Sequence, residues 1–107
     1  MASQQRTALV ISKSGSGDNT LLTAQTGSKI RVHSYTLVAA GSVTVAFESG
    51  ASGTALTGDM SLIIGVPLTA PFEREGHFET TVSTLLNLEL GGAVQVSGHL
   101  TYSLVAA

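Results

Sequence analysis

The sequence predicts an all-β protein: a single-domain antiparallel β-sandwich of jelly-roll type, with about eight to nine strands and no helix of note. Valine, isoleucine, threonine, phenylalanine and tyrosine gather in short runs, separated by glycine, serine, aspartate and asparagine. That composition is typical of strands joined by tight turns. Within the runs, residues such as Val43, Val45 and Phe47 alternate with smaller or polar ones, which indicates one buried face. Short strands at this spacing favour a sandwich over a barrel.

The first two strands are expected on either side of a flexible connection. Arg6 to Ser12 holds the first apolar run and Asn19 to Ala24 the second. Between them, SKSGSGDN has the glycines and the asparagine that favour a loop or a hairpin connection. Gln25 to Ser28 then turns the chain. Residues 1–5, ahead of the first run, are predicted to form a flexible N-terminal arm.

The next two strands are predicted to form the central hairpin of the sandwich. Lys29 to Ala40 is a long alternating run, and Val43 to Ser49 follows it. Ala40-Gly41-Ser42 supplies a tight reversal between them. We therefore expect these two strands to lie side by side, with their apolar rows in the core.

One side of the long strand is a candidate contact surface. Arg31, His33, Tyr35 and Leu37 share a row, whereas Ile30 belongs to the opposite one, so the apolar content changes sides partway along the strand. Large apolar side chains on a nominally outer face suggest cover from something other than the chain's own core. We expect that cover to be a neighbouring subunit.

The second half of the chain is predicted to hold shorter strands and one proline-rich connection. The segment GVPLTAPFEREG contains both prolines, which exclude a central strand there and favour an ordered loop or an edge segment. Gly58-Asp59 predicts a bulge or bend, and Gly91-Gly92 predicts a hairpin. The strands expected in this half are Ala55 to Ile64, His77 to Val82, Leu85 to Leu90 and Ala93 to Val105.

Size and charge restrict the classes of function. A chain of 107 residues is expected to form one domain, 1–107. Charged residues make up 11% of it, against about 25% in an average protein, and the formal net charge of −2 predicts no nucleic-acid binding. The apolar runs are shorter than the ~20 residues of a membrane-spanning helix, and the N-terminal segment does not fit a secretory signal. These features predict a soluble protein that is made in the cytoplasm and used without export.

Residues suited to enzyme chemistry are sparse. The chain has no cysteine, so it forms neither disulfides nor thiolate metal sites. Two glutamates that flank Arg74 in the proline-rich segment are interpreted as a solvated acidic turn rather than as a catalytic pair. No nucleophile elbow, phosphate-binding loop or dinucleotide fingerprint is present. We predict no enzyme, no catalytic residue, no cofactor and no metal site, since the histidines have no short ligand spacing: His33, His77 and His99.

Charge is distributed unevenly along the chain. Four of the five basic residues lie in the first third, whereas four glutamates and one arginine follow from Ala70 onward. Opposite charges on different edges of a small domain favour head-to-tail contacts between copies, as in a closed ring. The basic residues of the first third are Arg6, Lys13, Lys29 and Arg31.

Several segments between Gly27 and Val105 form a recognisable succession. They are GSKIRVHSYTLVAAGSVTVAFESG, LTGDMSL, GHFET after the proline-rich segment, LLNLEL and VQVSGHLTYSLV. This succession resembles small β-sandwich (jelly-roll) virion proteins of tailed bacteriophages and related prophages, of the head decoration or cement type. Its motifs consist of turn and core residues, so they are more diagnostic of architecture than of task.

The resemblance implies a non-enzymatic structural protein that sits on the capsid surface as a homotrimer and is synthesised in the bacterial host cytoplasm. Its implied partners are the major capsid protein and its own copies, with no nucleic acid and no membrane. The residues that we expect at a subunit or capsid interface are Arg6, Lys13, Arg31, His33, Tyr35, Leu37, Pro67, Leu68, Pro71 and Phe72.

Two alternatives are open. Jelly rolls also occur as carbohydrate-binding modules, although this chain has no tryptophan, two tyrosines and three phenylalanines for stacking on sugars. Loss of glycan binding on changing Tyr35 or Tyr102 would favour that class. A tail or baseplate component shares every sequence feature with a capsid decoration protein.

Overall fold

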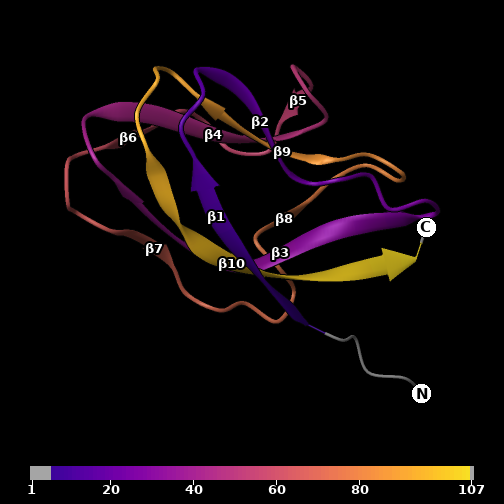
Figure 1. Ribbon diagram of the computed structural model, residues 1–107. Helices are drawn as coiled ribbons and strands as arrows, with labels where there is room; N and C mark the ends of the chain where they lie inside the picture. Colours follow the sequence, from indigo (N-terminus) through magenta and orange to yellow (C-terminus); the bar gives the residue numbers. More distant parts are fainter. Residues whose placement is uncertain (1–5, 107) are drawn as a thin grey trace.

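Residues 6–106, which the computed structural model describes, form ten strands in two antiparallel sheets that pack face to face (Figure 1). This confirms the predicted all-β sandwich. No helix in this part of the chain is long and apolar enough to cross a membrane. In chain order the strands are β1 (Thr7–Lys13), β2 (Gly17–Leu22), β3 (Ser28–Ala39), β4 (Val43–Ser49), β5 (Thr54–Ala55), β6 (Met60–Leu62), β7 (Leu68–Ala70), β8 (Phe78–Glu79), β9 (Leu86–Leu90) and β10 (Val96–Ala106).

The two sheets have a nested strand order. The first sheet runs β1-β10-β3-β7, with β8 also paired to β3, and the second runs β2-β9-β4-β5, with β6 also paired to β4. The first strand thus pairs with the last and the second with the last but one. The chain behaves as one long antiparallel hairpin that has been rolled up, which is the winding of a jelly roll.

Both hairpins predicted from glycine-containing turns are wrong. β3 and β4 belong to different sheets, as do β9 and β10, so the chain crosses the sandwich at each turn. The turn segments instead bond to segments distant in sequence: the Ala40 amide donates to the Gln95 carbonyl at 2.9 Å, and the Gly91 amide to the Thr44 carbonyl at 2.8 Å. A short glycine turn permits either a hairpin or a crossing, and burial of the apolar inner face of each sheet selects the crossing.

A bulge explains why apolar side chains change sides along β3. In the pairing with β10, Val32 lies opposite Tyr102 and Ser34 opposite Thr101, which leaves His33 without a partner. The extra residue shifts the alternation by one position. The inner row of β3 consequently runs through Ile30 and Val32 before the bulge and through Tyr35, Leu37 and Ala39 after it.

Aromatic and aliphatic side chains from both sheets fill the core. Phe47 of β4 has no exposed surface and lies between Tyr35 and Phe78 of the opposite sheet, with ring centroids 4.9 and 5.0 Å away. Such tilted ring pairs add to the hydrophobic contribution of burial. The largest fully buried side chains besides Phe47 and His33 are Ile11, Ile30, Val32, Leu37, Val45, Leu86, Leu88, Leu90, Val96 and Leu100.

The structure confirms the interruption predicted at Gly58-Asp59 and the irregular course of the proline-rich connection. The expected interruption at Gly58-Asp59 falls between the short strands β5 and β6. The proline-rich connection contributes only the three-residue β7, at the edge of the first sheet. Proline lacks an amide hydrogen, which keeps this segment out of the sheet interior. The predicted N-terminal arm, residues 1–5, lies outside the described residues.

A glycine in the middle of β10 allows the backbone of β3 to approach closely. Gly98 has φ 153°, and a Cβ atom there would collide with the carbonyl oxygen of Thr36 on β3. We expect Gly98→Ala to lower the free energy of unfolding by about 3 kcal/mol or more, because β10 must move away from β3. Chemical denaturation measures this change.

The matched control is Gly92→Ala, where a Cβ meets no atom within 4 Å. Its effect should stay within about 0.5 kcal/mol. Equal stability of the two variants would contradict the close approach of β3 and β10.

Candidate functional site

The proline-rich connection carries most of the predicted contact residues that reach the surface. Pro67, Pro71 and Phe72 are exposed, and the Phe72 side chain keeps 53% of its surface accessible. Nearer the N-terminus, Arg6 directly precedes β1 and Lys13 is the last residue of that strand. The predicted contact residues that are exposed or half-buried are Arg6, Lys13, Arg31, Pro67, Leu68, Pro71 and Phe72.

Three residues predicted to meet a neighbouring subunit are instead buried by their own chain. His33 and Leu37 have no exposed surface, and Tyr35 has 8%. The bulge at His33 moves Tyr35 and Leu37 onto the inner row of β3, where both pack between the sheets. They are therefore core residues, and the prediction that they belong to an outward contact surface is wrong.

His33 is covered by the connection between β7 and β8. Its Nδ1 donates to the carbonyl oxygen of Glu73 at 2.8 Å, so in the neutral ring Nε2 accepts from Ser103 Oγ, 2.7 Å away. Phe72 stacks on the imidazole with centroids 5.6 Å apart, and the Arg6 guanidinium lies 5.1 Å from the Phe72 centroid. Nδ1 thus holds the connection, and Nε2 holds the ring against Ser103 of β10, which makes His33 a structural residue.

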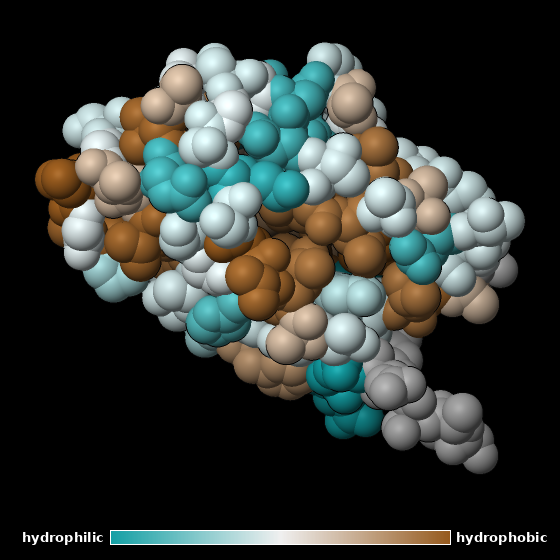
Figure 2. Space-filling model, viewed as in Figure 1, coloured by the Kyte–Doolittle hydropathy of each residue, from teal (hydrophilic) through white to brown (hydrophobic). Residues whose placement is uncertain are grey.

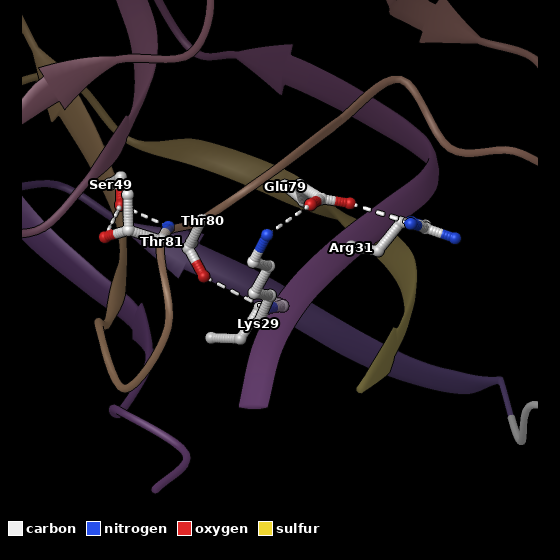
Figure 3. A network of polar contacts seen from close by, with 7 residues as sticks. Lys29, Arg31, Ser49, Glu79, Thr80 and Thr81 are labelled. Carbon is white, nitrogen blue, oxygen red and sulfur yellow. Dashed lines mark hydrogen bonds and ion pairs between the residues drawn. The ribbon is translucent and has the colours of Figure 1, made fainter. Parts of the chain in front are cut away.

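Arg31 is bound within the chain as well. Its Nε and Nη2 donate to Glu79 Oε1 at 3.0 and 2.9 Å, and Lys29 Nζ lies 3.3 Å from Glu79 Oε2 (Figure 3). Arg31 lies directly opposite Glu79 in the β3–β8 pairing. The hydrogen bonds from Arg31, more than those from Lys29, lower the pKa of Glu79. Glu79 thus pairs with Arg31 and Lys29, two of the basic residues that we expected to attract another copy.

The segment after β8 ties the two sheets together. Thr80 Oγ1 accepts a hydrogen bond from the Ile30 amide of the first sheet at 2.9 Å. The next residue, Thr81, donates its amide hydrogen to Ser49 Oγ of the second sheet at 3.0 Å (Figure 3). The polar contacts around β3 and β8 therefore stabilise the sandwich and do not form a chemical site.

An apolar surface that the sequence did not single out lies at one end of the sandwich. Ile63, Ile64 and Val66, in the β6–β7 connection, are 61%, 64% and 55% exposed. We call these three residues the apolar end. Figure 2 shows apolar groups over this connection, at the left of the view. Two consecutive isoleucines directly before Gly65 could have indicated an exposed apolar turn, but the alternating pattern placed Ile64 at the end of a predicted strand.

An open hollow adjoins the apolar end. It has a volume of about 440 Å³ and is lined by residues 42–44, 61–63 and 91–92. Its lining contains aliphatic side chains, hydroxyl groups and glycine backbone, without a titratable side chain. The hollow therefore suits contact with an apolar surface better than acid–base chemistry.

The edge of the first sheet is a second accessible surface. β1 is the edge strand, and Val10 at its centre is 80% exposed. Figure 2 shows another apolar group over the middle of β1. An edge strand of seven residues presents unpaired backbone groups that can pair with another chain.

The three histidines occupy separate places. His33 lies beneath the proline-rich connection, His77 Nε2 donates to the Pro71 carbonyl at 2.7 Å, and His99 is exposed on β10. Among residues 6–106, the group of side chains close enough to hold a metal ion contains carboxylates and no histidine.

Comparisons with known proteins identify a shared fold. No family model and no curated protein matches this sequence. A chain from Bacillus endospore appendages, described as a novel family of disulfide-linked pili, is similar with a TM-score of 0.58 at 14% identity, over 98% of this chain and 91% of that one. A chain of infectious bursal disease virus strain Gx aligns with 92% of this chain and 32% of its own length, at 14% identity and a TM-score of 0.38, too low to establish a common fold. The likeness to the pilus chain concerns the fold, and this chain has no cysteine for disulfide linkage.

The Glu79 ion pair predicts a pH dependence of stability. A carboxyl group with a lowered folded-state pKa stabilises the fold above its ordinary pKa of 4.5, and this contribution is lost as the pH falls through the folded value. We expect Glu79→Gln to lower the free energy of unfolding by about 1 kcal/mol at pH 7, with a smaller difference from wild type below about pH 4. Urea unfolding across this pH range measures the difference.

Glu75→Gln is the matched control, because Glu75 is exposed and outside both ion pairs of the described chain. It should leave stability unchanged at pH 7. A Glu79→Gln effect that is as large at pH 3 as at pH 7 would contradict the ionic origin of the stabilisation.

Proposed function

We propose that this protein is a non-enzymatic structural component of a tailed-bacteriophage virion. It decorates or cements the capsid surface as a homotrimer, through contacts with the major capsid protein and with its own copies. The observation that carries the proposal is the apolar end, with three large aliphatic side chains exposed together on a sandwich with few charges. The resemblance over Gly27 to Val105 supports the virion assignment.

The apolar end would contribute part of the binding energy of a contact between subunits. Burial of one aliphatic side chain contributes about 1.5–3 kcal/mol, so these three, each more than half exposed, together contribute about 3–4 kcal/mol. Scattered apolar residues are normal on a protein surface, whereas a cluster beside an open hollow favours an interaction site. A protein repeated many times on one shell needs only modest affinity at each contact.

Charged side chains outside the two ion pairs of residues 6–106 support a head-to-tail arrangement. Arg6 and Lys13 lie at the two ends of the edge strand β1, whereas acidic side chains gather on the outer face of the second sheet. Opposite charges on different surfaces favour contact between unlike faces of two copies, which closes into a ring when the rotation allows. The pilus chain of similar fold is a further case of such a sandwich in a larger structure.

No observation favours the carbohydrate-binding alternative. Tyr35 is buried and Tyr102 is half-buried. Among residues 6–106, Phe72 is the one phenylalanine or tyrosine that is largely exposed, and its ring already contacts His33 and Arg6. A tail or baseplate component, in contrast, would use the same surfaces, so its separation from a capsid protein depends on copy number.

Oligomeric state tests the role of the apolar end. Sedimentation velocity at micromolar concentration should give a trimer for the wild-type chain and a monomer for the double variant Ile63→Ser/Ile64→Ser, because the variant loses apolar contact area. Both residues are exposed, so circular dichroism should show an unchanged fold.

Val82→Ser is the matched control. Val82 is 42% exposed, and the amide of the next residue, Ser83, donates to Ser28 at the start of β3. The apolar end lies near the other end of β3, because the Gly65 amide donates to Ala39 there. The control therefore alters an apolar surface at the opposite end of the sandwich and should remain trimeric. A wild-type chain that is strictly monomeric and does not bind capsids would refute the proposal.

Copy number tests the location in the particle. Quantitative mass spectrometry of purified virions should find this chain in the hundreds per particle, because a decoration protein repeats with the capsid lattice. A count of a few copies would assign the chain to the tail or baseplate and contradict capsid decoration.

A further inference from the structure

The outer face of the second sheet gathers three carboxylates from three adjacent strands. Asp18 on β2 lies directly opposite Glu89 on β9. Glu48 on β4 lies opposite Asn87, which precedes Glu89 by two residues on β9. One oxygen from each carboxylate lies within 4.8 Å of the others. We call Asp18, Glu48 and Glu89 the acidic cluster. They come from distant parts of the sequence, so the sheet topology alone brings them together.

Asn87 provides a second, independent observation. It has no exposed surface, and its Nδ2 donates to Asp18 Oδ1 and Glu48 Oε1, both at 2.9 Å. The Nδ2 end of the side chain therefore points into the acidic cluster. Its Oδ1 is buried and has no hydrogen-bond partner. A buried amide oxygen without a partner is uncommon and destabilising unless another group binds it.

The negative charge of the acidic cluster has no counter-charge in the described chain. Both ion pairs among residues 6–106 involve Glu79, which belongs to the other sheet. Glu48 is only 8% exposed. Ser52 Oγ donates to Asp18 Oδ2 at 2.8 Å, which is a contact with a neutral hydroxyl group. Carboxylates held this close repel one another, and a cation between them would remove that repulsion.

We propose that the acidic cluster and Asn87 form a binding site for one divalent cation of the Ca²⁺ type. The three carboxylates each supply an oxygen ligand. A half-turn about the Asn87 Cβ–Cγ bond brings Oδ1 to face them as a fourth ligand. Its contact with the cation offsets the two hydrogen bonds that Nδ2 gives up, and water completes the shell.

The donor set favours Ca²⁺ over other cations. Carboxylate and amide oxygens are hard ligands, and the site offers neither the imidazole nor the thiolate that Zn²⁺ prefers. Ca²⁺ accepts about six to eight oxygens in flexible geometry, whereas Mg²⁺ requires a near-octahedral shell and keeps more of its water. The exposed side of Asp18 leaves room for water ligands. Bound Ca²⁺ would join β2, β9 and β4, whatever the protein's place in a virion.

Calorimetry and thermal unfolding of the full chain test this site. CaCl₂ titrated into chelator-treated protein should bind with one ion per chain and a Kd of about 0.1–1 mM. Circular dichroism should show a rise in Tm of about 5 °C when Ca²⁺ exceeds the Kd by about tenfold, and a smaller rise with Mg²⁺. The absence of binding heat and of any Tm shift at millimolar Ca²⁺ would overturn the proposal.

Charge-neutral variants locate the site. Asp18→Asn and Glu89→Gln should abolish the Ca²⁺-induced rise in Tm, whereas Glu75→Gln, an exposed glutamate outside the acidic cluster, should retain it. In EDTA, Glu89→Gln should melt no lower than wild type because one repulsive charge is gone, which separates loss of the ion from loss of the fold. A Ca²⁺-induced rise of equal size in Glu89→Gln and Glu75→Gln would place binding elsewhere and overturn the proposal.

Discussion

The pairing of β3 with β10 is the constraint on which the rest of the structure depends. These two strands, of 12 and 11 residues, lie at the centre of the first sheet, with β1 on one side and β7 and β8 on the other. Their register contains one bulge, which leaves His33 unpaired and sets which β3 side chains enter the core. Because alternation has a period of two, a single extra residue exchanges the inner and outer rows beyond it.

That bulge also determines how the outer side of β3 is used. His33 anchors the proline-rich connection, and Arg31 binds Glu79 on β8. The polar groups that looked available for a partner are thus engaged in fixing segments of the same chain. Surfaces free for assembly lie instead at the apolar end, around Ile63 and Ile64, and along the edge strand β1.

The nested strand order creates neighbours that are remote in sequence. β2, β9 and β4 lie side by side in the second sheet, so Asp18, Glu48 and Glu89 meet although about 70 residues separate the first from the last. Asn87 sits among them with an unused oxygen. Although few residues of this chain are charged, three carboxylates lie close enough to repel one another. That repulsion is the physical reason for proposing a cation at this place.

Local patterns in the sequence determined the all-β class and most strand positions. Alternation placed β4 at Val43–Ser49 as the structure has it, and the prolines kept the segment around Pro67 and Pro71 out of the sheet interior, because both effects act within a few residues. Only the tertiary structure decided that the turn at Gly41 crosses between sheets, that Tyr35 is a core residue and that the acidic cluster exists. Each of these depends on which distant strands pair and in what register, and that choice is made by burial of the whole chain rather than by any segment of it.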